Sequence, residues 1–130
     1  MYAYPTISIS KLHAEYTAWM EELTFYKEEL KIFELHLQNL VGKLECKDAK
    51  AGVEHFQNVF IRQNEVIDQL KHNLHVSEKQ LSVFVKKMSG MGLTSIKMDN
   101  HTRLRDEMQT FRKLFTEMKT DFRKFESECK

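Results

Sequence analysis

Two histidines at helical spacing are the first candidates for chemistry in this sequence. His72 and His75 follow Asp68 and Glu65 at intervals that place all four side chains on one side of a helix. Imidazole and carboxylate groups are both zinc ligands. The two histidines nevertheless occupy outward positions of the surrounding heptad pattern, where solvated polar faces are common. We therefore expect no bound metal, and His72 and His75 are the candidate ligands if one binds.

The remaining chemical motifs point away from catalysis. His101 is the one histidine in an apolar seam, where we expect a hydrogen-bonded core side chain rather than a metal ligand. Di-iron bundles need inward glutamates and Glu-x-x-His motifs, and no histidine here has a glutamate three residues before it. No recognisable order of nucleophile, histidine and acid occurs, and phosphate-loop glycines are absent. We expect no catalytic residue and no cofactor.

Basic residues concentrate in the last third of the chain, where nucleic-acid contact must be considered. Seven acids between positions 96 and 130 interleave with them, which favours a solvated face with salt bridges. Nucleic-acid binding is the alternative, because phosphate contacts need lysine and arginine. The residues that would make those contacts are Arg105, Arg112, Lys119 and Arg123.

Composition limits the architecture that must position these residues. A chain of 130 residues fits one domain (1–130), and residues 1–7 form a short arm before the first periodic segment. Charged residues make up 30% and hydrophobic residues 42%, which is typical of globular proteins. One proline and four glycines favour long helices. The net charge of +1 gives no bulk electrostatic reason to bind nucleic acid or an anionic membrane.

Several features favour the cytoplasm. Two cysteines, Cys46 and Cys129, do not make a disulfide framework, and we expect both to be reduced thiols. The first residues lack the basic-then-apolar layout of a signal peptide. No apolar run approaches the roughly 18 residues that a membrane span needs. We therefore expect a cytoplasmic protein without membrane contact.

Three segments carry apolar residues at alternating intervals of three and four, which is the heptad repeat of coiled-coil-like packing. Gln63 and Ser77 are polar exceptions in the second segment. The seams are Leu12, Tyr16, Trp19, Leu23, Tyr26, Leu30, Phe33, Leu37, Leu40 and Leu44; Val53, Phe56, Phe60, Gln63, Ile67, Leu70, Leu74, Ser77, Leu81, Phe84 and Met88; and His101, Leu104, Met108, Phe111, Phe115, Met118, Phe122, Phe125 and Cys129. The pattern predicts an all-α, up-down-up three-helix antiparallel bundle with helices near 8–45, 49–89 and 96–128.

Polar residues and glycines at the helix ends support these boundaries. Small polar side chains cap helix N-termini, and glycine commonly follows the last turn. The candidate caps are Ser8 or Ser10, Asp48, and Thr94, Ser95 or Asp99, while residues 89–92 end the second helix.

Charges beside the seams predict how the first and third helices align. A short link near 45–48 makes helices one and two antiparallel, so helices one and three run parallel. Parallel neighbours bring g positions of one helix against e positions of the other. Opposite charges at these positions are Glu15, Glu22 and Glu29 on the first helix and Arg105, Arg112 and Lys119 on the third. This alignment sets Trp19 level with Leu104, Leu12 with Lys97, and Leu44 with Cys129.

The same register makes specific predictions for the core. It places the small Ser77 opposite Trp19, as close packing favours. It also places His101 near Tyr16. Gln63 falls near Phe33 and Met118, where it either sets the register or bends out to solvent.

An apolar group on the first helix points away from this core. Phe25, Ile32 and Leu35 occupy c and f positions of the heptad. Such a patch can accept a second copy, a further helix or another protein. The alternative is that a neighbouring helix or the N-terminal arm, with Tyr2, Tyr4 and Ile7, covers it. We expect these three residues to bind a partner protein or to self-associate.

The segment Ala14–Glu22, which surrounds Trp19, resembles the first helix of a spectrin-type three-helix repeat. The resemblance implies a shared three-helix architecture, and the third helix lacks the tryptophan that such repeats often carry.

Together these patterns predict a non-catalytic protein-interaction or scaffold module that self-associates or serves as a small subunit of an assembly. A nucleic-acid-associated accessory subunit that uses the basic third helix is the alternative. A metal-binding or enzymatic bundle is the third class. No small-molecule substrate is evident, because a long bundle has little concave surface.

Overall fold

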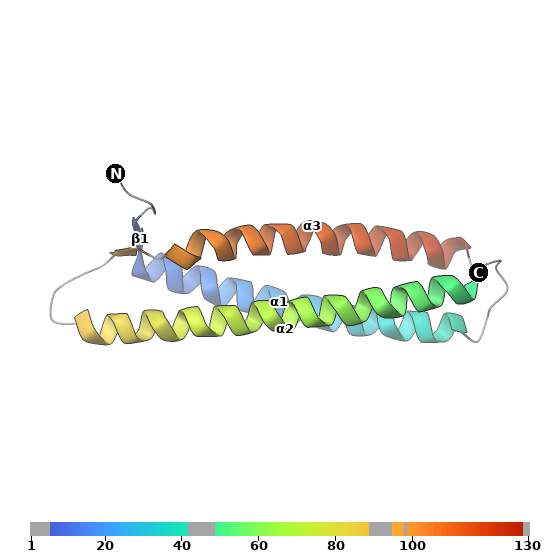
Figure 1. Cartoon of the computed structure of the whole chain (residues 1–130), viewed down its shortest axis with the longest axis horizontal. Coiled ribbons are helices and arrows are strands. Elements are labelled where there is room, and N and C mark those ends of the chain that lie inside the picture. Colours follow the sequence, from blue (N-terminus) through green and yellow to red (C-terminus); the bar gives the residue numbers. More distant parts are fainter. Residues whose placement is uncertain (1–5, 42–48, 89–94, 98, 129–130) are drawn as a thin grey trace.

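The computed structural model describes residues 6–41, 49–88, 95–97 and 99–128. Three long helices dominate this part of the chain, and they confirm the predicted all-α bundle. α1 and α2 run in opposite directions, while α3 runs in the same direction as α1 (Figure 1). The elements in chain order are β1 (Thr6–Ser8), α1 (Ile9–Val41), α2 (Ala49–Met88), β2 (Ser95–Lys97) and α3 (Asp99–Glu128).

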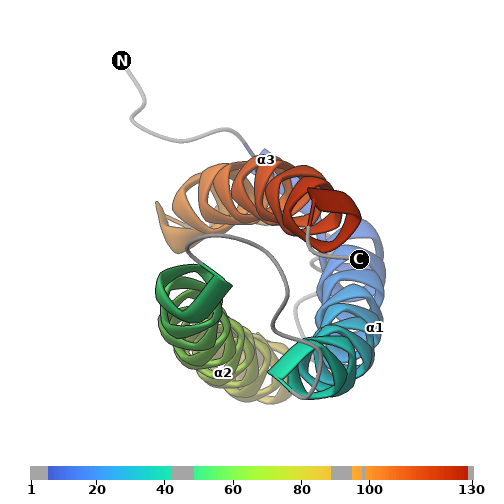
Figure 2. The same cartoon turned by 90° about the vertical axis from the view of Figure 1, so that its right-hand side faces the viewer.

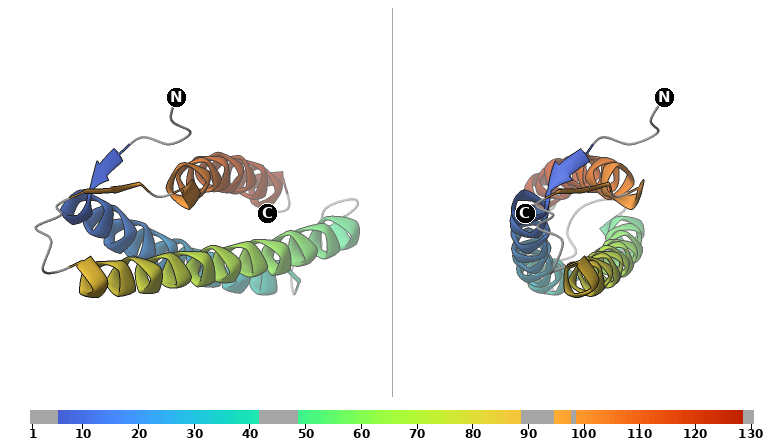
Figure 3. Two further views of the ribbon diagram at one scale, coloured as in Figure 1. Left: turned by 60° about the vertical axis from the view of Figure 1, so that its left-hand side comes forward. Right: turned by 90° about the vertical axis from the view of Figure 1, so that its left-hand side faces the viewer.

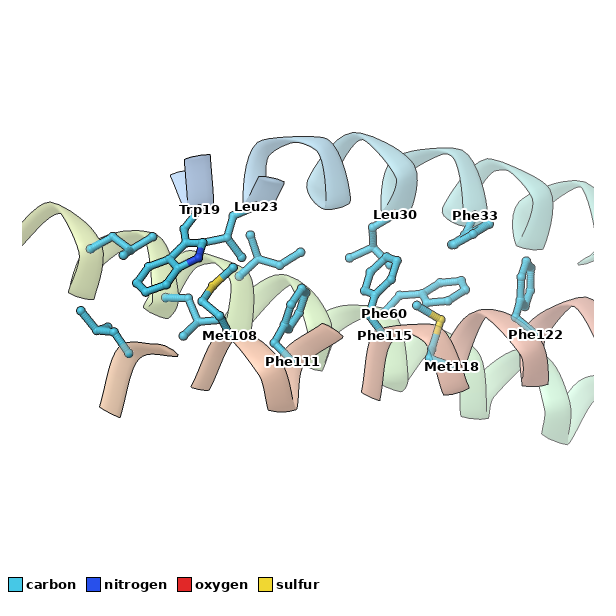
Figure 4. Close-up of a cluster of buried hydrophobic side chains, with 14 of the residues drawn as sticks. Trp19, Leu23, Leu30, Phe33, Phe60, Met108, Phe111, Phe115, Met118 and Phe122 are labelled. Carbon is cyan, nitrogen blue, oxygen red and sulfur yellow. The ribbon is translucent and has the colours of Figure 1, made fainter. Parts of the chain in front are cut away.

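The predicted heptad seams form the core. An end-on view shows the three helices arranged around a common centre (Figure 2). Seam side chains point from all three helices into this centre (Figure 4), and most are fully buried, including Leu23, Leu30 and Met108 at 0% exposure. Tyr26, Gln63, Phe84 and Phe125 are partly buried. Because burying one large apolar side chain stabilises a fold by about 1.5–3 kcal/mol, the seam is the main source of stability.

Phenylalanines fill the half of the core where α1 ends and α2 begins. The ring of Phe122 on α3 lies 5.7 Å from that of Phe33 on α1 and 5.1 Å from that of Phe60 on α2. Phe56 lies 5.2 Å from the same ring. Tilted and edge-on aromatic contacts at these separations add to the stabilisation that burial supplies. This cluster joins all three helices.

A short two-stranded sheet at the start of α1 and α3 was not predicted. β1 and β2 pair antiparallel, with Ile7 opposite Ile96 and Thr6 opposite Lys97 (Figure 3). The third helix therefore begins at Asp99 instead of near position 96, and Ser95 lies in a strand and does not cap a helix. The predicted register consequently does not extend to Lys97, which pairs with Thr6 and not with the level of Leu12.

The start of α1 agrees with the prediction. The backbone N–H of Lys11 donates to Oγ of Ser8 at 3.0 Å, which is the N-cap hydrogen bond expected of Ser8. Other predicted features lie outside the described residues: Tyr2, Tyr4, Leu44, Cys46, Asp48, residues 89–92, Thr94 and Cys129. None of the helices in the described part of the chain has a stretch long and apolar enough to cross a bilayer.

Candidate functional site

The predicted outward patch on α1 is exposed. Phe25, Ile32 and Leu35 have 64%, 51% and 60% of their surface open to solvent. The Phe25 ring meets the edge of the Tyr26 ring at 6.2 Å, and its outer side stays free of the described residues. Neighbouring helices therefore do not cover the patch. Tyr2 and Tyr4 of the N-terminal arm lie outside the described residues, and the side chain of Ile7 is not described.

Charged side chains stand among the three apolar residues of this patch. Glu28 lies one helical turn from Phe25 and from Ile32, and it pairs with Lys31 at 3.4 Å. Both side chains of this pair are more than half exposed, so the pair itself contributes little stability. Glu21 is exposed one turn before Phe25. The surface thus combines an apolar centre with acidic side chains on the N-terminal side and a lysine near its middle.

The charge ladder predicted between α1 and α3 is present. Its members join residues 90 positions apart at intervals of one heptad, which confirms the parallel register. A fourth rung, which the sequence reasoning missed, continues the ladder with a histidine on α1 and a glutamate on α3. The pairs are Glu15 with Arg105 at 2.9 Å, Glu22 with Arg112 at 2.8 Å, Glu29 with Lys119 at 2.9 Å, and His36 with Glu126 at 3.3 Å.

This ladder occupies most of the basic residues of α3 that were considered for nucleic-acid contact. Three of the four basic residues considered for phosphate binding are neutralised by glutamates of α1, while Arg123 is exposed without a described partner. The hydrogen bond with Glu22 raises the pKa of Arg112, and burial acts in the opposite direction. A phosphate would have to displace these carboxylates before it met those cations.

His101 lies in the core, as its seam position predicts. It is 5% exposed, its ring stacks on Trp19 at 5.7 Å, and it lies 6.0 Å from Tyr16. Arg105 Nη2 lies 3.1 Å from Nε2. Because arginine can only donate, Nε2 is the acceptor in this contact, while the buried Nδ1 has no hydrogen-bond partner among the described residues. Burial lowers the pKa of His101, which favours the neutral form.

Ser77, which the register predicts opposite Trp19, is 2% exposed and lies beside Tyr16 in the same layer of the core. Burial raises the pKa of Tyr16, and the hydrogen bond with Ser77 partly offsets this effect. The Trp19 ring lies 5.8 Å from that of Tyr16. These side chains form a polar contact among aromatic rings.

The candidate zinc ligands are not brought together. His72 and His75 are exposed, Asp68 pairs with Lys27 of α1, and Glu65 pairs with Arg62 at 3.4 Å. Within residues 6–41, 49–88, 95–97 and 99–128, no group of three histidines, cysteines or acids is arranged to hold a metal ion. The two carboxylates are committed to cations instead.

Open grooves lie between neighbouring helices, and neither is lined by Phe25, Ile32 or Leu35. One of about 720 Å³ lies between α1 and α2, where Val41 and Ile61 are exposed beside Asn64. A second of about 260 Å³ lies between α2 and α3. Gln63 lines it, and its buried Oε1 has no hydrogen-bond partner among the described residues. Leu114, 49% exposed, borders the same groove.

Comparisons with known proteins give no match to a family model, a curated protein or a solved structure. The sequence reasoning overlooked Ile61 and Leu114 as exposed apolar residues. Their signal was the same as that of Phe25, an apolar side chain outside the seam, but each stands alone on its helix face.

Proposed function

We propose that this chain is a non-catalytic helical interaction module that acts through protein contact, with Phe25, Ile32 and Leu35 as its contact surface. One observation supports this proposal above the others. Three large apolar side chains lie within three turns of one helix and remain more than half exposed. Apolar side chains at these positions contribute little to the stability of the bundle. More than half of their surface stays in contact with water after folding, so little of the hydrophobic effect is gained.

The size of the patch sets the strength of the interaction. Complete burial of one such side chain is worth about 1.5–3 kcal/mol, so covering what remains exposed yields a few kilocalories per mole from each copy. Association also costs translational and rotational freedom. We therefore expect weak, reversible binding unless a partner adds further contacts.

Light scattering over a concentration series tests this proposal. We expect the protein to exceed its monomer mass of 15.5 kDa at high concentration, and Phe25→Glu with Ile32→Glu to return it to monomer. Circular dichroism must show unchanged helicity, because no seam residue is altered. Val83→Glu is the matched control, since Val83 is 46% exposed on the outer side of α2.

The outcomes separate the interpretations. A monomer at every concentration removes self-association and leaves binding of a different protein, which the same double variant must abolish. If neither self-association nor such binding responds to the double variant, the patch is not the contact surface and the proposal is wrong.

A further inference from the structure

On the outward face of α1, exposed residues of complementary type lie at equal distances before and after one position of the helix. Position 30 is the midpoint between Phe25 and Leu35, and also between Glu21 and Asn39. Glu28 and Lys31 straddle nearly the same point. All six of these side chains, and that of Ile32, are exposed to solvent. When two copies of this helix lie antiparallel about position 30, the aromatic residue of one therefore lies opposite the aliphatic residue of the other. Each acid likewise lies opposite a base or an amide.

We propose that the occupant of this surface is a second copy of the chain, docked antiparallel about a two-fold axis near position 30 of α1. This inference rests on the proposed function and names its partner. Phe25 of each copy then packs over Leu35 of the other, and Ile32 fills the space between them. The interface is isologous, so each contact occurs twice.

Charge decides between the two symmetric arrangements of such helices. In a parallel pair each residue lies opposite itself, which brings Glu28 against Glu28 and Lys31 against Lys31. In the antiparallel pair Glu28 of each copy meets Lys31 of the other, and Glu21 meets the amide of Asn39. Like charges in contact disfavour the first arrangement, and complementary charges favour the second.

The existing pair on each helix is compatible with this arrangement. Glu28 and Lys31 are 3.4 Å apart on one helix, with side-chain exposures of 64% and 61%, so they are free to join a four-membered network across the axis. Exposed charge pairs contribute little affinity and mainly select orientation. The dimer is held by the apolar side chains and aligned by the charges.

Sedimentation equilibrium of charge variants tests the antiparallel pairing. Lys31→Glu places four acids at the axis and Glu28→Lys places four lysines there, so each variant alone should dimerise about fivefold more weakly than the unchanged protein at low salt. An equimolar mixture of the two variants should regain the original affinity, because each copy then offers the opposite charge. Glu28→Lys with Lys31→Glu in one chain should regain it as well.

Lys79→Glu is the matched control, because Lys79 is exposed on α2 away from the patch, and it should leave dimerisation unchanged. Single charge variants that dimerise like the unchanged protein, or a mixture no stronger than its components, would overturn the antiparallel pairing. Loss of dimerisation in Phe25→Glu with Ile32→Glu would still support the patch in that case. A protein that stays monomeric throughout overturns the second copy as partner, while binding of a different protein through the same residues would retain the proposed function.

Discussion

Gly52 is a single residue on which the packing of two helices depends. It lies in the first turns of α2, and an added Cβ would meet the ring of Phe125 on α3, with Cζ only 2.6 Å away. The Phe125 ring lies 5.2 Å from that of Phe56, so it is part of the aromatic end of the core. The absence of a side chain at Gly52 is what lets this ring lie against α2.

We expect the effect of Gly52→Ala on the free energy of unfolding to depend on whether Phe125 is present. Alanine inside a helix ordinarily stabilises by about 0.5–1 kcal/mol relative to glycine. In a Phe125→Ala background that gain should appear in urea unfolding. With Phe125 present the gain should vanish or reverse, because the ring must leave Phe56. Equal effects in both backgrounds would show that the ring does not lie against Gly52.

His101 should make stability depend on pH. Burial lowers its pKa from the ordinary value of 6.5; Glu15 opposes this effect, while Arg105 and Lys11 reinforce it. Between the two pKa values the unfolded chain binds a proton that the folded chain does not. The contribution of His101 to the free energy of unfolding should therefore be complete above pH 6.5. It should decline as the pH falls through the lowered pKa.

Urea unfolding over about three pH units around the ordinary histidine pKa would measure this decline. His101→Phe keeps a ring against Trp19 and removes the titrating group. The unchanged protein should lose more stability on acidification than this variant. The pairs His13–Glu78 and His36–Glu126 are present in both proteins, so the difference between the two reports on His101.

At the scale of elements, the α1–α3 ladder should show measurable coupling. Glu22 and Arg112 make two hydrogen bonds and are only partly exposed. Glu22→Lys should lower stability, and Arg112→Glu added to it should restore about 0.5–1 kcal/mol at low salt. The restored part should shrink as salt is raised. Reversal of the Arg103–Glu107 pair, which lies within α3, is the control. A cycle without coupling would mean that the ladder does not hold α1 and α3 together.

The elements differ in how far the sequence could predict them. Charges at fixed heptad flanks determine a register without any coordinates, which is why the positions of Glu15 and Arg105 could be matched across 90 residues. The pairing of β1 with β2 could not be anticipated, because three residues carry too little pattern to distinguish a strand from a helix start. Ser95 is a good cap by type, and only its pairing with Ser8 shows that it is extended.

The candidate surface was predictable for the same reason as the core. Once the seam is known, Phe25 must point outward, and the structure shows that no described neighbour covers it. The fourth rung was missed because its α1 member, His36, is a histidine, and only glutamates, lysines and arginines were matched across the seams. The sequence also could not predict that the buried Oε1 of Gln63 lacks a hydrogen-bond partner among the described residues, because this depends on the local spacing of α2 and α3.

At the scale of the whole molecule, the same substitution at two leucines of α1 should change the stability by very different amounts. Leu30 is 0% exposed and Leu35 is 60% exposed. Leu30→Asp would bury an unpaired carboxylate in the centre of the bundle and should cost several kilocalories per mole, on the order of 3–5. Leu35→Asp should change the stability of the dilute monomer by about 0.5 kcal/mol or less. Circular dichroism melting measures both, and a similar loss in the two variants would contradict the assignment of core and surface.

The 90-residue span of every rung in the ladder has a consequence for the order of folding. Contacts between α1 and α2 close shorter loops than those between α1 and α3, and closing a longer loop costs more entropy. We therefore expect the α1–α2 hairpin to form before the folding transition state and α3 to dock after it. Arg112→Ala should then accelerate unfolding in stopped-flow experiments and leave the folding rate nearly unchanged.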